Sequence, residues 1–482
     1  MDFKDASEQA QAVKTGEVSA REVVLESIKR IEELNPELKA VVSMQFEKAL
    51  AKADALIDLS APFAGVPILL KDLGQHQAGQ LSTSGSKLFA NYYANQDDNY
   101  TKKIEELGFI ILGRTNTPEF GFKNISDSQL HGLVNLPKDK TRNAGGSSGG
   151  AAAAVASGMV QLAGASDGGG SIRIPASFNG LIGLKPSRGR LPVGPGSYRG
   201  WQGASSHFAL TKSVRDTRQF LYGMQTCQLE SPFPLPTLSH DALFRKIAEP
   251  LTIAYRLESP IGTVLSDEAK WAVLEMVDKL TKLGHKLIPL ERDILDGVEV
   301  MKSYYIMNSV ETAQMFDQIE KSFGRDMTLS DMELMTWAIY QSGQKIPAKH
   351  YSQVLQDWDR YGAVMADFHK TYDLLLTPTV ASVAPKHGQF ALSPDLQENL
   401  KNMDSFSVAD QQDLIWEMFA DSLAWTPFTQ LQNLTGQPAI SLPTFVREDG
   451  LPIGVQLTSA KGREDLLLAL SEQIEESGLL KM

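Results

Sequence analysis

The sequence of 482 residues contains a single cysteine, Cys227. One cysteine excludes an internal disulfide framework and a cysteine-rich metal site. None of the eight histidines belongs to an HExxH pattern or to a cysteine–histidine zinc spacing. The sequence therefore predicts no metal site.

An excess of positive charge and a long apolar run are also absent. The formal net charge is −12, which argues against nucleic acid as a partner. The longest small and apolar run, Ala151–Ala165, is too short and too rich in alanine to span a bilayer. The first ten residues contain no apolar signal core. We expect a cytoplasmic protein that binds neither nucleic acid nor a membrane.

Linker-like segments are absent as well. Length alone suggests about three domains, but no stretch rich in glycine, serine or proline divides the chain. The hydrophobic fraction of 42% and the charged fraction of 22% are those of an ordinary globular protein. We therefore expect one domain over residues 1–482. The sequence does not define the oligomeric state, and a homodimer is one arrangement that it allows.

Two clusters of glycine and serine dominate the stretch Asn143–Pro192, and an alanine-rich segment predicted as a buried helix separates them. A flexible linker would not continue directly into the apolar run that begins at Ile172. Neither GxxxxGK[ST] nor a GxGxxG after an apolar strand is present, which argues against nucleotide binding. Successive small residues can form a nest of backbone N–H groups that holds an oxyanion. A serine at the end of such a nest, here Ser171, indicates acyl transfer.

The runs GGSSGG, DGGGSIRIPAS and GLKPSRGR closely resemble the signature of the amidase signature family of serine hydrolases. The resemblance implies a Ser–Ser–Lys triad and assigns Ser171 as the nucleophile. It assigns Ser147 as the bridging serine, which follows a non-proline cis peptide bond. Lys71, in the run GVPILLKD at Gly65–Asp72, is the third member.

The resemblance also implies the surroundings of the triad. The backbone amides of Gly168, Gly169 and Gly170 would hold the oxyanion together with that of Ser171, and Ser148 is a further binding candidate. Many members have TDTGGS where this chain has SDGGGS, so Gly168 is expected to loosen the loop. The chemistry requires no metal and no organic cofactor.

Lysine is a base only when it is neutral. At its ordinary pKa of about 10.4, roughly one lysine in 2,500 is neutral at pH 7. Burial disfavours the charged form and lowers the pKa. Lys71 follows the apolar run Val66–Leu70, which reads as a buried strand. Taken alone, a lysine at a strand end is more often a paired or partly exposed residue than a catalyst.

Three other functions remain open at this point. A Ser–His–acid hydrolase would use His131 or His207, although no GxSxG motif supports it. An A-type subunit of a tRNA-dependent amidotransferase would use the same triad, but Ser205–Leu210 does not match its SLDQIGP-like run. A non-catalytic binding protein on the same scaffold is the third alternative.

The favoured function is hydrolysis of a small linear or cyclic amide. The runs PFAGVPILLKDL, NLTGQPAISLP and GREDLLL are similar to the branch that contains 6-aminohexanoate cyclic dimer hydrolase. That branch places a pocket residue at the position of Asn308.

The family fold implied by the resemblance is α/β, with a single large mixed, twisted sheet covered by helices on both faces. Short apolar strands alternating with helices agree with it. Residues 65–216 would form the catalytic core, and residues 300–370 a variable helical region on the substrate side. Near the N-terminus, Ser19 and Glu22 predict a capping box, with the helix ending at Asn35–Pro36.

Overall fold

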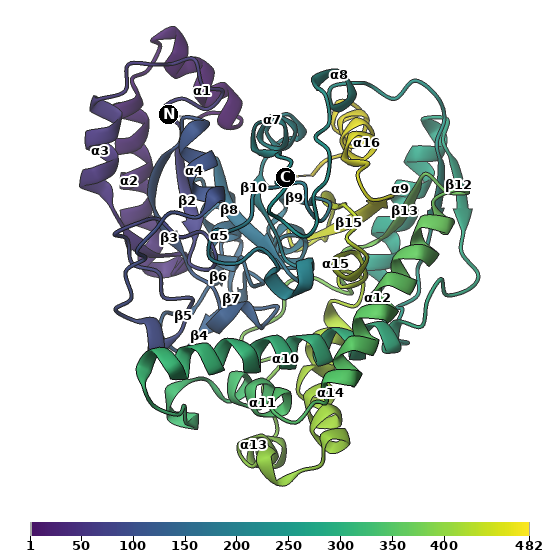
Figure 1. Ribbon diagram of the computed structural model, residues 1–482. Coiled ribbons are helices and arrows are strands. Elements are labelled where there is room, and N and C mark those ends of the chain that lie inside the picture. Colours follow the sequence, from purple (N-terminus) through teal and green to yellow (C-terminus); the bar gives the residue numbers. More distant parts are fainter. Residues whose placement is uncertain (1, 482) are drawn as a thin grey trace.

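A computed structural model describes residues 2–481. Its centre is an 11-stranded mixed sheet with helices on both faces (Figure 1), which confirms the expected α/β fold. The strands of this sheet are β1 (Val41–Met44), β2 (Pro67–Lys71), β3 (Ile110–Thr115), β8 (Leu162–Asp167), β9 (Ile182–Lys185), β10 (Ser206–Thr211), β11 (Thr252–Tyr255), β12 (Lys286–Pro289), β13 (Leu374–Pro378), β14 (Ala439–Val446) and β15 (Pro452–Ser459). Two small hairpins add β4 (Asp127–Ser128), β5 (Gly132–Leu133), β6 (Asn135–Leu136) and β7 (Asp139–Asn143).

The helices come from the whole length of the chain. They are α1 (Ala6–Thr15), α2 (Ala20–Leu38), α3 (Phe46–Asp54), α4 (Asn99–Glu106), α5 (Gly149–Ala156), α6 (Arg173–Asn179), α7 (Val214–Met224), α8 (His240–Leu243), α9 (Asp267–Lys282), α10 (Gly297–Phe323), α11 (Leu334–Gly343), α12 (Ala348–Phe368), α13 (Pro394–Lys401), α14 (Val408–Trp425), α15 (Leu431–Thr435) and α16 (Glu464–Glu476). No helix within residues 2–481 is both long enough and apolar enough to cross a membrane.

The strand order is β1-β3-β2-β8-β10-β9-β14-β15-β13-β11-β12. Near one end of this order, β3, β2 and β8 run parallel, and β10 joins β8 in the antiparallel sense. Because parallel strands end at the same edge of a sheet, β2 and β8 deliver their last residues to one place. Those residues are Lys71 and Asp167.

The N-terminal capping box is confirmed, since Ser19 and Glu22 bond each other's backbone N–H groups. The predicted end of this helix at Asn35–Pro36 is wrong, because α2 continues to Leu38. The Lys39 N–H still donates to the Asn35 carbonyl at 2.8 Å, which closes a further turn. Lys39 then takes a left-handed conformation with φ 52° and ends the helix.

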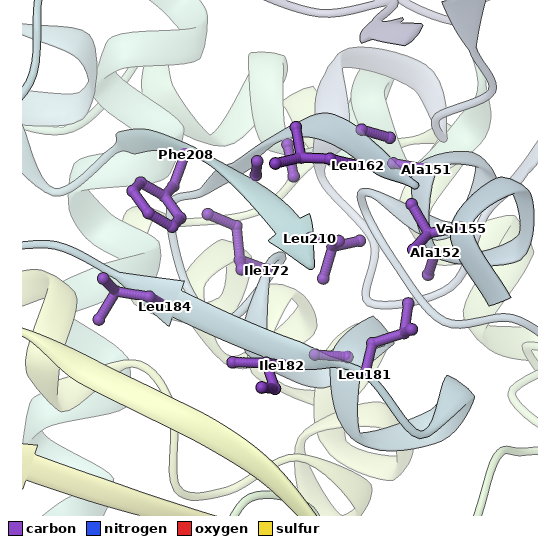
Figure 2. Close-up of a cluster of buried hydrophobic side chains, with 14 of the residues drawn as sticks. Ala151, Ala152, Val155, Leu162, Ile172, Leu181, Ile182, Leu184, Phe208 and Leu210 are labelled. Carbon is purple, nitrogen blue, oxygen red and sulfur yellow. The ribbon is translucent and has the colours of Figure 1, made fainter. Parts of the chain in front are cut away.

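The predicted buried helix is α5, whose alanines lie in the main core. Figure 2 shows side chains of α5 beside those of β8, β9 and β10, including Ala152, Leu162, Ile182 and Leu210. Small residues let this helix lie close to its neighbours. A Cβ on Gly150 would lie only 2.4 Å from the Asn116 nitrogen.

Helices α10 to α14 form a helical cover at the bottom of Figure 1. Their buried side chains belong mostly to two clusters separate from the main core. In the larger cluster, Tyr305 of α10 stacks on Phe419 of α14 with ring centroids 4.6 Å apart. The helix-rich character expected for residues 300–370 is therefore confirmed.

The two glycines Gly150 and Gly362 give a matched stability test. Alanine at Gly150 would collide with backbone atoms, so we expect a loss of about 1–3 kcal/mol in the free energy of unfolding. Alanine at Gly362 in α12 would meet no atom within 4 Å, and we expect a gain of about 0.5–1 kcal/mol from helix propensity. Urea unfolding of both variants measures the difference, and a stable Gly150→Ala protein would contradict the close packing of α5.

Candidate active site

Lys71 is fully buried at the end of β2. Its Nζ donates hydrogen bonds to Ser147 Oγ at 2.7 Å and to Ser166 Oγ at 3.0 Å. Burial lowers the pKa of Lys71 to about 7, against a smaller opposing effect of the Asp167 charge. A lysine with this pKa is substantially neutral at physiological pH and can accept a proton.

The backbone around Lys71 is held on both sides. Its N–H donates to Gln75 Oε1 at 2.8 Å, and its carbonyl accepts from Arg114 Nη1 at 3.0 Å. Arg114 Nη2 also donates to the Gln75 carbonyl at 2.8 Å. This buried arginine therefore fixes the turn after β2 and, with it, the start of the lysine side chain.

Ser147 lies before the first turn of α5, and the Gly146–Ser147 peptide bond is cis. Its neighbour Ser148 is fully buried. The Ser148 hydroxyl donates to the Ser166 carbonyl at 3.2 Å and accepts from the Ser166 N–H at 3.3 Å. Ser148 thus ties α5 to β8, and it is not among the residues that line the cavity described next.

Ser171 opens into a cavity of about 520 Å³ that Ser147, Ser166 and Gly168 also line. Within residues 2–481 the Ser171 hydroxyl has no hydrogen-bond partner, so it is free to meet a ligand. The structure therefore brings Lys71 and Ser147 into direct contact, and it places Ser147 and Ser171 on the wall of one cavity.

The glycine loop differs in one respect from the expected oxyanion site. The Gly170 N–H donates to Asp167 Oδ1 at 2.7 Å, so this amide is already occupied. No hydrogen bond within the described chain occupies the N–H of Gly168, Gly169 or Ser171. Those three amides remain as candidate oxyanion donors.

Gly168 has a steric reason to lack a side chain. A Cβ at this position would lie 2.8 Å from the Trp201 ring, which also lines the cavity. The expected loosening of the loop is therefore offset by an aromatic ring packed against it. Gly169 is similarly enclosed, because its Cβ would lie 2.8 Å from the Tyr304 hydroxyl.

Asp167 and Arg173 form a completely buried ion pair, with 2.8 Å between Oδ1 and Nη2. Asp167 also accepts from the N–H groups of Gly170 and Ile172. Burial alone would raise the pKa of Asp167, but the Arg173 charge and hydrogen bonds lower it to about 2. Arg173 also donates to the side chains of Gln432 and Asn433 in α15 and of Gln456 in β15.

A second fully buried lysine, Lys185, provides an internal comparison. Burial also lowers its pKa to about 7. Its Nζ, however, donates to the Pro186 carbonyl at 2.8 Å and touches no serine hydroxyl. A low pKa alone therefore does not distinguish a candidate base, and the contact of Lys71 with Ser147 does.

Neither histidine singled out in the sequence bonds to Ser171 or Ser147. His131 Nε2 contacts Thr83 Oγ1 at 2.8 Å. His207 lines the cavity, and its buried Nδ1 has no partner among the described residues. The geometry thus favours lysine over histidine as the base.

Asn308 lies on α10 and is 3% exposed, with no partner for its Oδ1 within residues 2–481. It does not line the cavity, whereas Glu311 and Thr312, about one turn further along α10, do.

Ser166 is the site residue that the sequence reasoning missed. Its signal was the SDGGGS run itself. Ser166 is the last residue but one of β8, and successive side chains of a strand point to opposite faces, so Asp167 meets Arg173 and Ser166 meets Lys71.

Comparison with known proteins places these features in a family. The model of the family described as Amidase matches residues 22–468. The chain belongs to the amidase family. This confirms the resemblance seen in the sequence, and it makes the protein a hydrolase of carbon–nitrogen amide bonds other than peptide bonds.

Individual relatives of this amidase cover nearly the whole chain. A lipoamidase of Enterococcus faecalis is 38% identical over 478 residues, which are 99% of this chain but only 64% of the lipoamidase. A 6-aminohexanoate-cyclic-dimer hydrolase of Paenarthrobacter ureafaciens is 33% identical, covering 98% of this chain and 94% of its own. The solved structure of 6-aminohexanoate cyclic dimer hydrolase with substrate has a TM-score of 0.89 at 32% identity, covering 99% and 97% of the two chains.

The buried ion pair of this amidase gives a prediction for Arg173→Met. Removing the arginine leaves Asp167 buried and unpaired, so we expect the free energy of unfolding to fall by about 3–5 kcal/mol. Arg360→Met is the control, because Arg360 and Glu299 are 52% and 50% exposed and such pairs contribute about 0–1 kcal/mol. Equal losses in the free energy of unfolding for the two variants, measured in urea, would contradict the stabilising role of the Asp167–Arg173 pair.

Proposed function

We propose that this amidase cleaves a small linear or cyclic aliphatic amide through an acyl-serine intermediate, with Ser171, Ser147 and Lys71 as its triad. The observation that carries the proposal is the 2.7 Å contact between Lys71 Nζ and Ser147 Oγ in a fully buried setting. A serine hydroxyl needs a base to become a nucleophile, and we propose Lys71 as the base that acts on Ser171 through Ser147.

In the proposed reaction, neutral Lys71 accepts the Ser147 proton while Ser147 accepts the proton of Ser171. The Ser171 oxygen then bonds to the substrate carbonyl carbon. Ser166 accepts a hydrogen bond from Nζ at 3.0 Å, which fixes the lysine beside Ser147. Collapse of the tetrahedral intermediate breaks the carbon–nitrogen bond, and the proton returns through Ser147 to the leaving amine.

Water completes the cycle by the same route. Its oxygen attacks the acyl carbon, its proton passes to Lys71, and the Ser171 oxygen regains a proton as the acid leaves. The N–H groups of Gly168, Gly169 and Ser171 are proposed to hold both oxyanions, and each such donor is worth about 3–4 kcal/mol. Gly170 instead holds the loop to Asp167.

The cavity supports a small amide as the substrate. Its volume of about 520 Å³ is within the range of ligand pockets, about 300–1,000 Å³. Phe120, Phe122 and Trp201 are among the lining residues, and their rings suit an aliphatic chain. The names of the lipoamidase and the cyclic dimer hydrolase point to the same class of substrate, small amides.

The cytoplasmic location, the homodimer and the division of residues 1–482 into a core and a substrate-side region stay predictions from the sequence.

Labelling with a fluorophosphonate tests the triad directly. We expect the adduct on Ser171 by peptide mapping, and its loss in both Ser171→Ala and Lys71→Ala, because the nucleophile needs its base. Hydrolysis of a reactive amide should fall by about three orders of magnitude or more in each variant. An adduct on another serine, or labelling that survives in Lys71→Ala, would contradict the mechanism.

The pH dependence of kcat/KM tests the base. Only neutral Lys71 can accept a proton, so kcat/KM should rise with pH through about 7 and then level off. Lys185 has the same low pKa, so Lys185→Met is the matched control and should keep the inflection. Loss of the inflection in Lys185→Met would show that the pH dependence comes from Lys185 and would contradict Lys71 as the base.

A further inference from the structure

Helix α10 extends along the cavity from the glycine loop outward. The Tyr304 hydroxyl lies beside Gly169, and Glu311 and Thr312 line the cavity further along the same helix. Residues seven or eight apart lie on the same face of a helix. At 1.5 Å per residue, Glu311 is about 10 Å from Tyr304 along the helix axis. The part of α10 that lines the cavity, from Glu311 to Gln318, therefore begins about 10 Å along the helix axis from the contact of Tyr304 with the glycine loop.

Glu311 presents a carboxylate that is only partly used. Its Oε1 accepts hydrogen bonds from Gln202 Nε2 at 2.9 Å and from the Tyr351 hydroxyl. Burial, together with this hydrogen bond, raises the pKa of Tyr351, so the hydroxyl stays a donor. Among residues 2–481, Glu311 Oε2 has no hydrogen-bond partner. One oxygen is thus fixed in place and the other is available.

The neighbouring cations do not neutralise this carboxylate. Within the described chain, Glu311 forms no ion pair. Arg199 donates to Gln202 Oε1 at 3.4 Å, on the far side of that amide from Glu311. Arg188 lines the cavity, but its guanidinium donates to three backbone carbonyls and lies over the Phe233 ring. A negative charge therefore faces the cavity without a counter-ion from the described protein.

Two more oxygens on this face of α10 lack partners. Thr312 Oγ1 and Asn308 Oδ1 are buried, their residues are 2% and 3% exposed, and neither atom has a hydrogen bond among residues 2–481. Buried polar groups without partners are rare and mark places where a ligand or water is expected. Glu311 and Thr312 line the cavity and make an acceptor wall, whereas Asn308, about one turn earlier on α10, does not line it.

Aromatic rings stand beside the acceptor wall. Phe122 and Trp201 stack with centroids 6.0 Å apart, and Trp201 meets Tyr304 edge-on at 6.0 Å. Trp201 directly precedes Gln202, the residue that holds Glu311. The faces of such rings attract cations, so the acceptor wall and the rings favour the same kind of ligand group.

We propose that this amidase selects amide substrates that carry a primary ammonium group, which binds the acceptor wall beside Trp201. An ammonium has three donors and no acceptor, which matches a carboxylate with unsatisfied oxygens next to it. The spacing of about 10 Å leaves room for an aliphatic chain between the scissile amide and the ammonium. The inference rests on the proposed function, in which Ser171 attacks that amide.

Isosteric substrate pairs test the proposal on either side of the scissile bond. On the acyl side, 6-aminohexanamide is compared with heptanamide, in which a methyl group replaces the ammonium. On the amine side, N-(6-aminohexyl)acetamide is compared with N-heptylacetamide. The measured quantity is the ratio of kcat/KM within each pair, for the wild type and for Glu311→Gln.

We expect the wild type to prefer the ammonium member of at least one pair. Glu311→Gln should lower kcat/KM for that member about two- to fivefold, mainly through KM, since it removes a partly exposed ion pair and leaves the contact with Trp201 in place. Its kcat/KM for the neutral member should fall less, so that the ratio within the pair decreases. Raising the salt concentration should weaken the wild-type preference.

Glu320→Gln is the matched control. Glu320 is on the same helix and also accepts a tyrosine hydroxyl, that of Tyr340 at 2.8 Å, but it does not line the cavity. This variant removes the same charge and should leave the ammonium preference intact. An equal loss in both variants, or an equal fall for the ammonium and neutral substrates, would overturn the proposal.

Binding separates this proposal from the proposed function. Calorimetric titration of the Ser171→Ala protein with the same compounds needs no turnover. Tighter binding of an ammonium member that disappears in Ser171→Ala/Glu311→Gln supports the site even when the triad mechanism fails. Equal binding of the ammonium and neutral members of both pairs overturns it, even in an enzyme that hydrolyses amides.

Discussion

The buried pair of Asp167 and Arg173 is the interaction on which the rest of the site depends. It joins the end of β8 to α6, and through Arg173 it reaches α15 and β15. The same carboxylate fixes Gly170 and Ile172 on either side of Ser171. Because two buried charges are stable only when fully paired, the loop has little freedom. Ser171, the proposed nucleophile, is thus positioned by hydrogen bonds from its neighbours Gly170 and Ile172 to this buried carboxylate.

Lys71 depends on the opposite condition, the absence of a close counter-ion. It makes no ion pair among residues 2–481, and its two partners are neutral hydroxyls. Parallel β2 and β8 bring it to the sheet edge where Asp167 also ends. Strand β8 therefore ends in a paired carboxylate that is charged at physiological pH, and its neighbour β2 ends in a lysine whose pKa is about 7. Adjacent strands provide two electrostatic environments within one site.

The sequence was informative where the signal was local and less so where it was not. The capping box at Ser19 and the strand ending in Lys71 follow from neighbouring residues, and the family motif located the site. The contact of Lys71 with Ser166 joins positions 95 residues apart, so no local pattern reports it. The Gly170 N–H is occupied because the folded chain directs the Asp167 carboxylate toward it, and no sequence pattern reports that direction. Ser148 was a binding candidate from its place in the motif, but its hydroxyl bonds the backbone of Ser166 in β8.

The helical cover has buried clusters of its own, apart from the core around the sheet. Evolution can therefore exchange many side chains in α10 to α14 without disturbing the strands that end in Lys71 and Asp167. Of this cover, α10 reaches the cavity through Glu311, Thr312, Gln314, Met315 and Gln318. Exchanges at these positions can reshape part of the cavity wall while the strands of the sheet stay unchanged.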